Sequence, residues 1–185
     1  GLGDTWLYGK YAFMDDPTIT ARLGLKLATG DSEGDSDGGP VGEGQMDLDA
    51  AVMLGMPLGP GRLDAAVGYR LRMSKEVEYL VFRDGMTLDY NPGNEIHVDA
   101  HYAYALNDAM GVRLGLNGFF GGDDDIEPAS RETKENSGRS AFMLAPGFDY
   151  TLQNGIGLGL DVFFPVMGKN VDSLWGVGLS VAWSK

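Results

Sequence analysis

The chain lacks cysteine, has few basic side chains and contains no long hydrophobic run. None of its 185 residues is cysteine, which excludes a disulfide framework and thiolate metal sites. Its 14 Lys and Arg face 27 Asp and Glu, giving a formal net charge of -13. That balance excludes nucleic acid as a partner, because a phosphate backbone is bound by clustered cations. No stretch of about 18 apolar residues occurs, so the sequence predicts no transmembrane helix.

Glycine, in contrast, is abundant, and apolar and polar residues alternate. The 29 glycines fit a chain with many turns and with small residues facing inward from curved strands. Around residues 18–27, Leu23, Leu25 and Leu27 point one way while Arg22 and Lys26 point the other. This period of two is typical of a strand with one apolar and one polar face.

Nine strands are predicted from this alternation, and most are long. Strands of about ten to twelve residues exceed the usual five or six and are long enough to cross a bilayer at a tilt. The predicted ranges are Thr5–Phe13, Thr18–Ala28, Gln45–Met56, Arg62–Met73, Glu95–Leu106, Met110–Phe120, Ala141–Leu152, Ile156–Met167 and Leu174–Trp183.

Short turns and long loops alternate between these strands. The long connections, 30–44, 74–93 and 121–140, carry formal charges of -5, -2 and -3, so most of the acidity lies in loops that we expect to be solvated. This alternation is how outer-membrane barrels are built. The predicted fold is therefore all-β, a single domain over 1–185 forming an antiparallel up-and-down transmembrane β-barrel.

Aromatic and charged residues favour a membrane barrel over a soluble one. Outward aromatics gather at both strand ends, as expected for two interfacial girdles. Charges at mid-strand positions on the other face need a water-filled lumen, because a small filled barrel could not solvate them.

The strand count is odd, whereas bacterial single-chain barrels have an even number. The first and the ninth predicted strands both run from the long-loop end to the short-turn end. Either the strand count is wrong by one, or further strands precede Gly1.

Several segments resemble a known family: GLGD (1–4), GKYAF (9–13), LGLKLATGD (23–31) and GQMDLDAAVMLG (44–55). They are similar to the outer-membrane "phenol-degradation MetA-pathway", or SphA-like, transporters, and the similarity runs from Gly1 to about Arg72. Ala28 stands where that family usually has proline. The resemblance implies a barrel of roughly twelve strands, with some upstream of GLGD, and uptake of small hydrophobic or aromatic molecules.

Charged residues and histidines of inward phase are the predicted lumen residues. We expect the turn at 59–61 to set Asp49 roughly opposite Arg72, and the fifth strand to bring His97 and Asp99 alongside Arg70 and Arg72. Such a cluster is either a constriction that selects polar or anionic groups or an ion-pair ladder that braces the wall. The predicted set is Arg22, Lys26, Asp49, Arg70, Arg72, His97, Asp99, His101, Arg113 and Asp161.

Two patterns raise the question of metals and catalysis. Carboxylates at every second position, Asp31, Glu33, Asp35 and Asp37, indicate either a solvated acidic loop or a weak calcium site. The only two histidines, His97 and His101, have no identifiable third ligand, and no serine lies in phase beside them. We therefore expect no resident cofactor and no enzymatic activity.

The sequence thus predicts a channel in the bacterial outer membrane. Its partners would be membrane lipid or lipopolysaccharide and a small-molecule solute. Two alternatives remain at this stage: a soluble or periplasmic β-barrel that binds an apolar ligand, and a structural or adhesive surface barrel.

Overall fold

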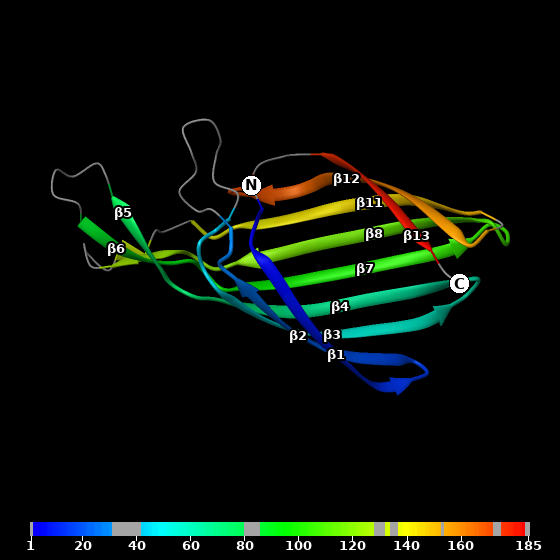
Figure 1. Cartoon of the computed structure of the whole chain (residues 1–185), viewed down its shortest axis with the longest axis horizontal. Coiled ribbons are helices and arrows are strands. Elements are labelled where there is room, and N and C mark those ends of the chain that lie inside the picture. The colour runs from blue at the N-terminus through cyan, green and yellow to red at the C-terminus, as the bar shows by residue number, and fades with distance from the viewer. Residues whose placement is uncertain are drawn as a thin grey trace.

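The fold is an antiparallel all-β structure, seen in a computed structural model that describes residues 2–30, 42–79, 86–127, 132–133, 137–152, 154–171 and 175–183. Nine long strands form one sheet in the order β1-β2-β3-β4-β7-β8-β11-β12-β13 (Figure 1). They are β1 (Thr5–Asp15), β2 (Thr18–Leu27), β3 (Asp47–Leu58), β4 (Gly61–Arg72), β7 (Glu95–Ala105), β8 (Met110–Gly121), β11 (Ser140–Thr151), β12 (Ile156–Lys169) and β13 (Gly176–Trp183). Over the described ranges, no helix has the length and apolar character to cross a membrane.

These nine strands confirm the predicted all-β class and the predicted element order. Each begins and ends within about two residues of its predicted range, because the alternation that defines a strand is local in the sequence. Every neighbouring pair is antiparallel.

The long loops contain a second sheet that the sequence did not predict. Four short strands, β5 (Lys75–Tyr79), β6 (Met86–Asn91), β9 (Asp125–Glu127) and β10 (Glu132–Thr133), pair in the order β10-β9-β6-β5. Two loops far apart in sequence pair with each other and extend beyond one end of the large sheet (Figure 1). The Tyr90 hydroxyl anchors this sheet to Asp124 at 2.7 Å.

The large sheet is strongly curved, with β1 and β13 crossing in front of its central strands (Figure 1). These two strands are the ends of the pairing order, and within the described residues no ladder joins them. Both run from the long-loop end to the short-turn end.

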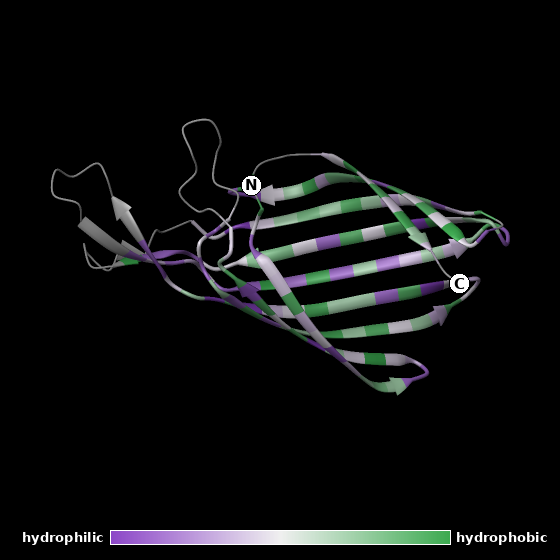
Figure 2. Cartoon of the chain, in the orientation of Figure 1, coloured by the Kyte–Doolittle hydropathy of each residue, from purple (hydrophilic) through white to green (hydrophobic). Residues whose placement is uncertain are grey.

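The two faces of the sheet differ sharply in exposure. Outward apolar residues such as Leu23 and Leu179 are 68% and 81% exposed, whereas Asp47 and Asp49 on the other face are 1% and 2% exposed. Figure 2 shows the resulting alternation of hydrophobic and hydrophilic positions along the strands. We call the polar, less exposed side the inner face. Among the described residues, the buried hydrophobic side chains are all alanines: Ala51, Ala141 and Ala145.

The register between β3 and β4 differs from the prediction. Leu58 pairs with Gly61, so that only Gly59 and Pro60 form the turn, with Gly59 at a φ of 57° that suits glycine. Because this turn is shorter than predicted, the pairing between β3 and β4 is shifted by two residues from the predicted register. Asp49 therefore pairs with Arg70 rather than with Arg72, which lies opposite Asp47 instead.

Candidate functional site: the charged inner face

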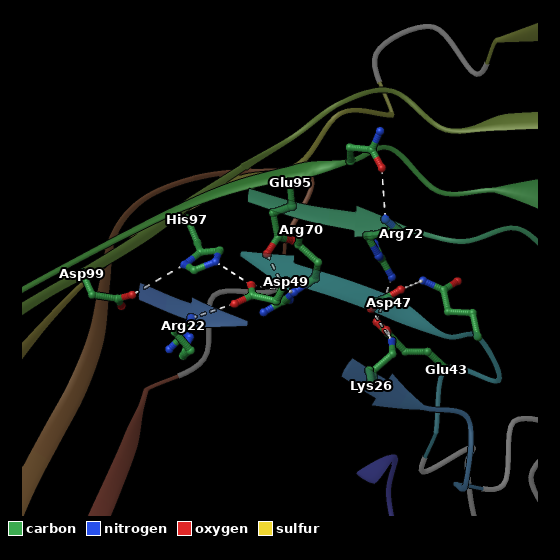
Figure 3. A network of polar contacts seen from close by, with 12 residues as sticks. Arg22, Lys26, Glu43, Asp47, Asp49, Arg70, Arg72, Glu95, His97 and Asp99 are labelled. Carbon is green, nitrogen blue, oxygen red and sulfur yellow. Dashed lines mark hydrogen bonds and ion pairs between the residues drawn. The ribbon is translucent and has the colours of Figure 1, made fainter. Parts of the chain in front are cut away.

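Asp49 is the centre of a polar network on the inner face of β2, β3, β4 and β7. Its side chain is 0% exposed and accepts a hydrogen bond from Arg22 Nη2 at 2.9 Å. His97 Nε2 lies 2.7 Å from the other carboxylate oxygen, and Arg70 Nε lies 3.8 Å from it. Figure 3 shows these side chains converging on Asp49 from three strands. A buried carboxylate needs such partners, because an unpaired charge away from water is costly.

The β4–β7 register adds a partner that the sequence prediction missed. Arg70 pairs across the strands with Glu95, and its Nη1 donates to Glu95 Oε1 at 3.1 Å. His97 and Asp99 pair with Gly68 and Ala66, two and four residues along β4 from Arg70, so the expectation that they stand alongside Arg70 and Arg72 was wrong.

Lys26 is the centre of a second group nearer the long loops. Its side chain is 4% exposed, and its Nζ lies 2.6 Å from Asp47 Oδ2 and in an ion pair with Glu43. Arg72 Nη2 donates to the same Glu43 at 3.0 Å, and Asp4 Oδ2 lies 3.9 Å from Lys26. The two groups sit side by side in Figure 3.

The acids of the Lys26 group that lie outside the strands are shifted toward the ionised form. Burial raises the pKa of the Asp4 carboxyl, but hydrogen bonds from the Glu43 and Gly30 amides and the charge of Lys26 outweigh it, and the pKa falls below its usual value. For Glu43, burial is likewise outweighed by Lys26 and Arg72, which hold its pKa low. In the loop sheet, burial and the hydrogen bond to Asp124 raise the pKa of Tyr90 to about 12.

Two aromatic rings on β1 cover this network. Trp6 and Tyr8 are stacked, with ring centroids 5.4 Å apart. The Arg70 guanidinium lies 4.9 Å from the Trp6 ring centroid, and that of Arg22 lies 5.1 Å from the Tyr8 centroid. The cation–π contact of Trp6 with Arg70 links the edge strand β1 to β4, two strands beyond its neighbour β2. Both faces of β1 carry aromatic residues, with Trp6 and Tyr8 on one and Tyr11 and Phe13 on the other.

A separate ion group lies on β8, β11 and β12. Arg113 Nε lies 2.9 Å from Asp149 Oδ2, and Arg113 Nη2 lies 3.1 Å from Asp161 Oδ1. The predicted lumen residues Arg113 and Asp161 are thus brought together, but away from the Asp49 network.

Inward glycines let long side chains lie flat on the wall. A Cβ at Gly68 would come within 2.3 Å of the His97 ring, and one at Gly24 within 2.6 Å of Tyr8. A Cβ at Gly147 would come within 2.3 Å of Asp161. A larger residue at these positions would force the rings and the carboxylate away from the strands. The high glycine content therefore has a structural role beyond turns.

A cavity of about 390 Å³ opens on the inner face toward the short turns. His101 and Asp99 both line it, and Asn117 Nδ2 donates to Asp99 Oδ1 at 2.7 Å. The remaining lining includes Thr20, Arg22, Met53, Arg62, Asp64 and Ala66.

The structure bears on the metal question only in part. The predicted calcium ligands Asp31, Glu33, Asp35 and Asp37 lie outside the described residues. Elsewhere in the described chain, no group of three or more His, Cys, Asp and Glu side chains is arranged to hold a metal ion.

Comparison with known proteins places nearly the whole chain in one family. The family described as "Putative MetA-pathway of phenol degradation" matches residues 1–181, nearly the whole chain. No curated protein sequence matches it.

Proposed function

The chain belongs to the family of the MetA pathway of phenol degradation, and from this membership and the inverted polarity of its sheet we propose that it forms the wall of a channel in the bacterial outer membrane. The solutes would be small molecules, with hydrophobic or aromatic ones suggested by the family's description. The proposed role is passage and not catalysis.

The observation that supports this most is the exposure of the two faces. Water-soluble proteins bury large apolar side chains and expose charged ones. Here Leu23, Val52 and Leu179 are exposed, while Lys26 and Asp49 are buried. Lipid would cover the first group in a membrane, and a polar lumen would contain the second.

Aromatic residues at the strand ends also support a membrane setting. Phe13 and Trp183, near the short turns, are 64% and 70% exposed, and Phe120 and Trp175, near the long loops, are 50% and 74% exposed. Exposed rings at two levels match the girdles that meet the two membrane interfaces. Membrane lipid or lipopolysaccharide would contact this outer surface.

Closure of the sheet into a barrel is part of the proposal. Since β1 and β13 run in the same direction, they would meet as a parallel pair if joined directly. An odd number of further strands between them would complete an antiparallel barrel with an even strand count, as bacterial barrels have.

In this channel the ten predicted residues would line the lumen. The ion pairs of Asp49, Arg70 and Glu95 support the bracing of the wall, which is compatible with a constriction at the same level. The proposed lumen set is Arg22, Lys26, Asp49, Arg70, Arg72, His97, Asp99, His101, Arg113 and Asp161.

Reconstitution tests the channel. The protein, refolded from detergent into lipid vesicles, should admit small uncharged solutes in a swelling assay and give discrete conductance steps in a planar bilayer. A protein that stays monodisperse without detergent, or vesicles that remain sealed, would overturn the proposal.

A further inference from the structure

Asp99 differs from the other carboxylates of the charged inner face. Asp49, Glu95 and Asp64 each lie within ion-pair distance of an arginine. Among the described residues, Asp99 has as its ion-pair neighbour only His97 Nδ1, at 3.7 Å, and its one hydrogen bond comes from a neutral amide. Its side chain is 35% exposed. An ionised carboxylate can accept about four hydrogen bonds, so Asp99 has acceptor sites to spare.

These free acceptor sites belong to a residue that lines the cavity of about 390 Å³, which we call the Asp99 cavity. Two guanidiniums line it as well, but Arg22 is paired with Asp49 and Arg62 with Asp64. The charged groups of the cavity and these partners therefore comprise three carboxylates and two guanidiniums. Among these carboxylates and guanidiniums, the uncompensated charge is negative and lies at Asp99.

The rest of the lining is suited to an apolar body. Met53 and Ala66, which share the inward phase of Asp99, line the same cavity beside Thr20. A volume of about 390 Å³ lies in the range of small-molecule sites, which are mostly apolar with a few polar groups that set orientation.

We propose that the Asp99 cavity binds small organic cations, with an ammonium group paired to the Asp99 carboxylate and an apolar body against Met53 and Ala66. Its role in transport rests on the proposed channel, in which it would favour a cation over an anion of the same size and shape. A charge-assisted hydrogen bond to Asp99 is stronger than one from a neutral hydroxyl, so the order of affinity is ammonium, then alcohol, then carboxylate.

Binding of three probes of matched size tests this proposal. Benzylammonium, benzyl alcohol and benzoate would be titrated calorimetrically into the detergent-solubilised protein at pH 8, above the ordinary imidazole range. Benzylammonium should bind about tenfold more tightly than benzyl alcohol, and benzoate most weakly. Benzoate binding as tightly as benzylammonium would overturn the proposal.

Variants test whether the preference for benzylammonium depends on Asp99. Asp99→Asn should weaken benzylammonium binding about tenfold and leave benzyl alcohol within about twofold, whereas Asp99→Glu should restore much of the preference. Asp108→Asn, an equal charge change in an exposed short turn, is the matched control and should change neither affinity. An Asp99→Asn protein that retains wild-type benzylammonium affinity would refute the assignment. Should that variant fail to fold, the order of the three probes on the wild-type protein still decides.

Solute flux into vesicles distinguishes a failure of the Asp99 cavity from a failure of the proposed channel. Vesicles that pass benzylammonium faster than benzoate support both proposals. Vesicles that pass neither, combined with the expected binding order in detergent, would overturn the channel and leave the binding site standing. Vesicles that pass both probes equally, without a binding preference, would overturn only the Asp99 site.

Discussion

Two regions of the inner face contrast with each other. The charged wall, on β1 to β4 and β7, holds stacked rings and ion pairs centred on Asp49 and Lys26. The bare wall, on β13 and on residues 156–160 of β12, presents mostly small residues: Gly157, Gly159, Gly178, Ser180 and Ala182. The strand β13 contains no charged residue at all. Both walls share the same backbone ladder, so the difference lies entirely in the side chains.

The comparison indicates that the side chains of the two walls have different roles. On the charged wall, side-chain interactions connect strands that are not neighbours, as when Arg70 of β4 reaches Trp6 of β1. On the bare wall, backbone pairing with β12 holds β13 in place. We therefore expect substitutions on the charged wall to affect stability, and substitutions on the bare wall to affect the width of the proposed lumen.

The largest difference in stability between the two walls should come from removing the buried Asp49 carboxylate. Asp49→Ala leaves Arg22, Arg70 and His97 without their shared carboxylate and should lower the free energy of unfolding by about 3–5 kcal/mol. Urea unfolding of the protein folded in lipid vesicles measures this loss. Ser180→Ala on the bare wall is the control and should cost less than about 0.5 kcal/mol. Equal midpoints for the two variants would remove the distinction between the walls.

A smaller loss is expected from filling the space beneath His97. In Gly68→Ala, the new methyl group would meet the imidazole, which must leave Asp49 or distort the strand, at a cost of about 1–3 kcal/mol. Gly176→Ala places the same methyl group on β13, where no atom lies within 4 Å. The NMR shift of the His97 ring should move in the first variant only. An unmoved ring in Gly68→Ala would contradict this account of the inward glycines.

Acidification should loosen the long-loop end of the charged wall. Asp4 and Glu43 have lowered pKa values in the folded protein, so the stability they contribute is present above their unfolded pKa and is lost as the pH falls through the lower, folded pKa. The amides of Gly30 and Glu43, which donate to Asp4, should then lose protection against hydrogen exchange relative to their intrinsic rates. Amides of β13 serve as the internal reference. Equal loss of protection in both places would point to global unfolding instead.

The smallest effect on stability should come from enlarging a bare-wall side chain. Ser180→Tyr adds a ring on the inner face, where we expect it to extend into the lumen, so the unfolding midpoint should hardly change while single-channel conductance falls. A conductance equal to that of the wild type would show that β13 does not border the path of ions.

Strand positions were predictable from the sequence because alternation is a local property. The inward phase of Arg22, Asp49, His97 and Arg113 followed from it directly. Contacts between these residues were less predictable, since they depend on register: a turn of two residues at Gly59 and Pro60 moved Arg70 opposite Asp49. Nothing local marked Glu95 as the partner of Arg70.

The residues that lie across several strands were hardest to predict. Trp6 reaches Arg70 over two intervening strands, and Arg113 reaches Asp161 over one. Such contacts depend on the curvature of the sheet and on the inward glycines between them. The pairing of β6 with β9 joins two loops whose separation in sequence leaves no periodic signal.

The sequence by itself determined the number of long strands, the facing of most residues and the segregation of charge, because each follows from a period of two read along one strand. Only the tertiary structure decided which charges meet, which carboxylate remains open and which wall is bare. Those depend on how neighbouring strands slide against one another and on how far a long side chain can reach across a glycine. Asp99 and Asp49 have the same side chain and the same phase, and only the fold gives one of them two arginines and the other a cavity.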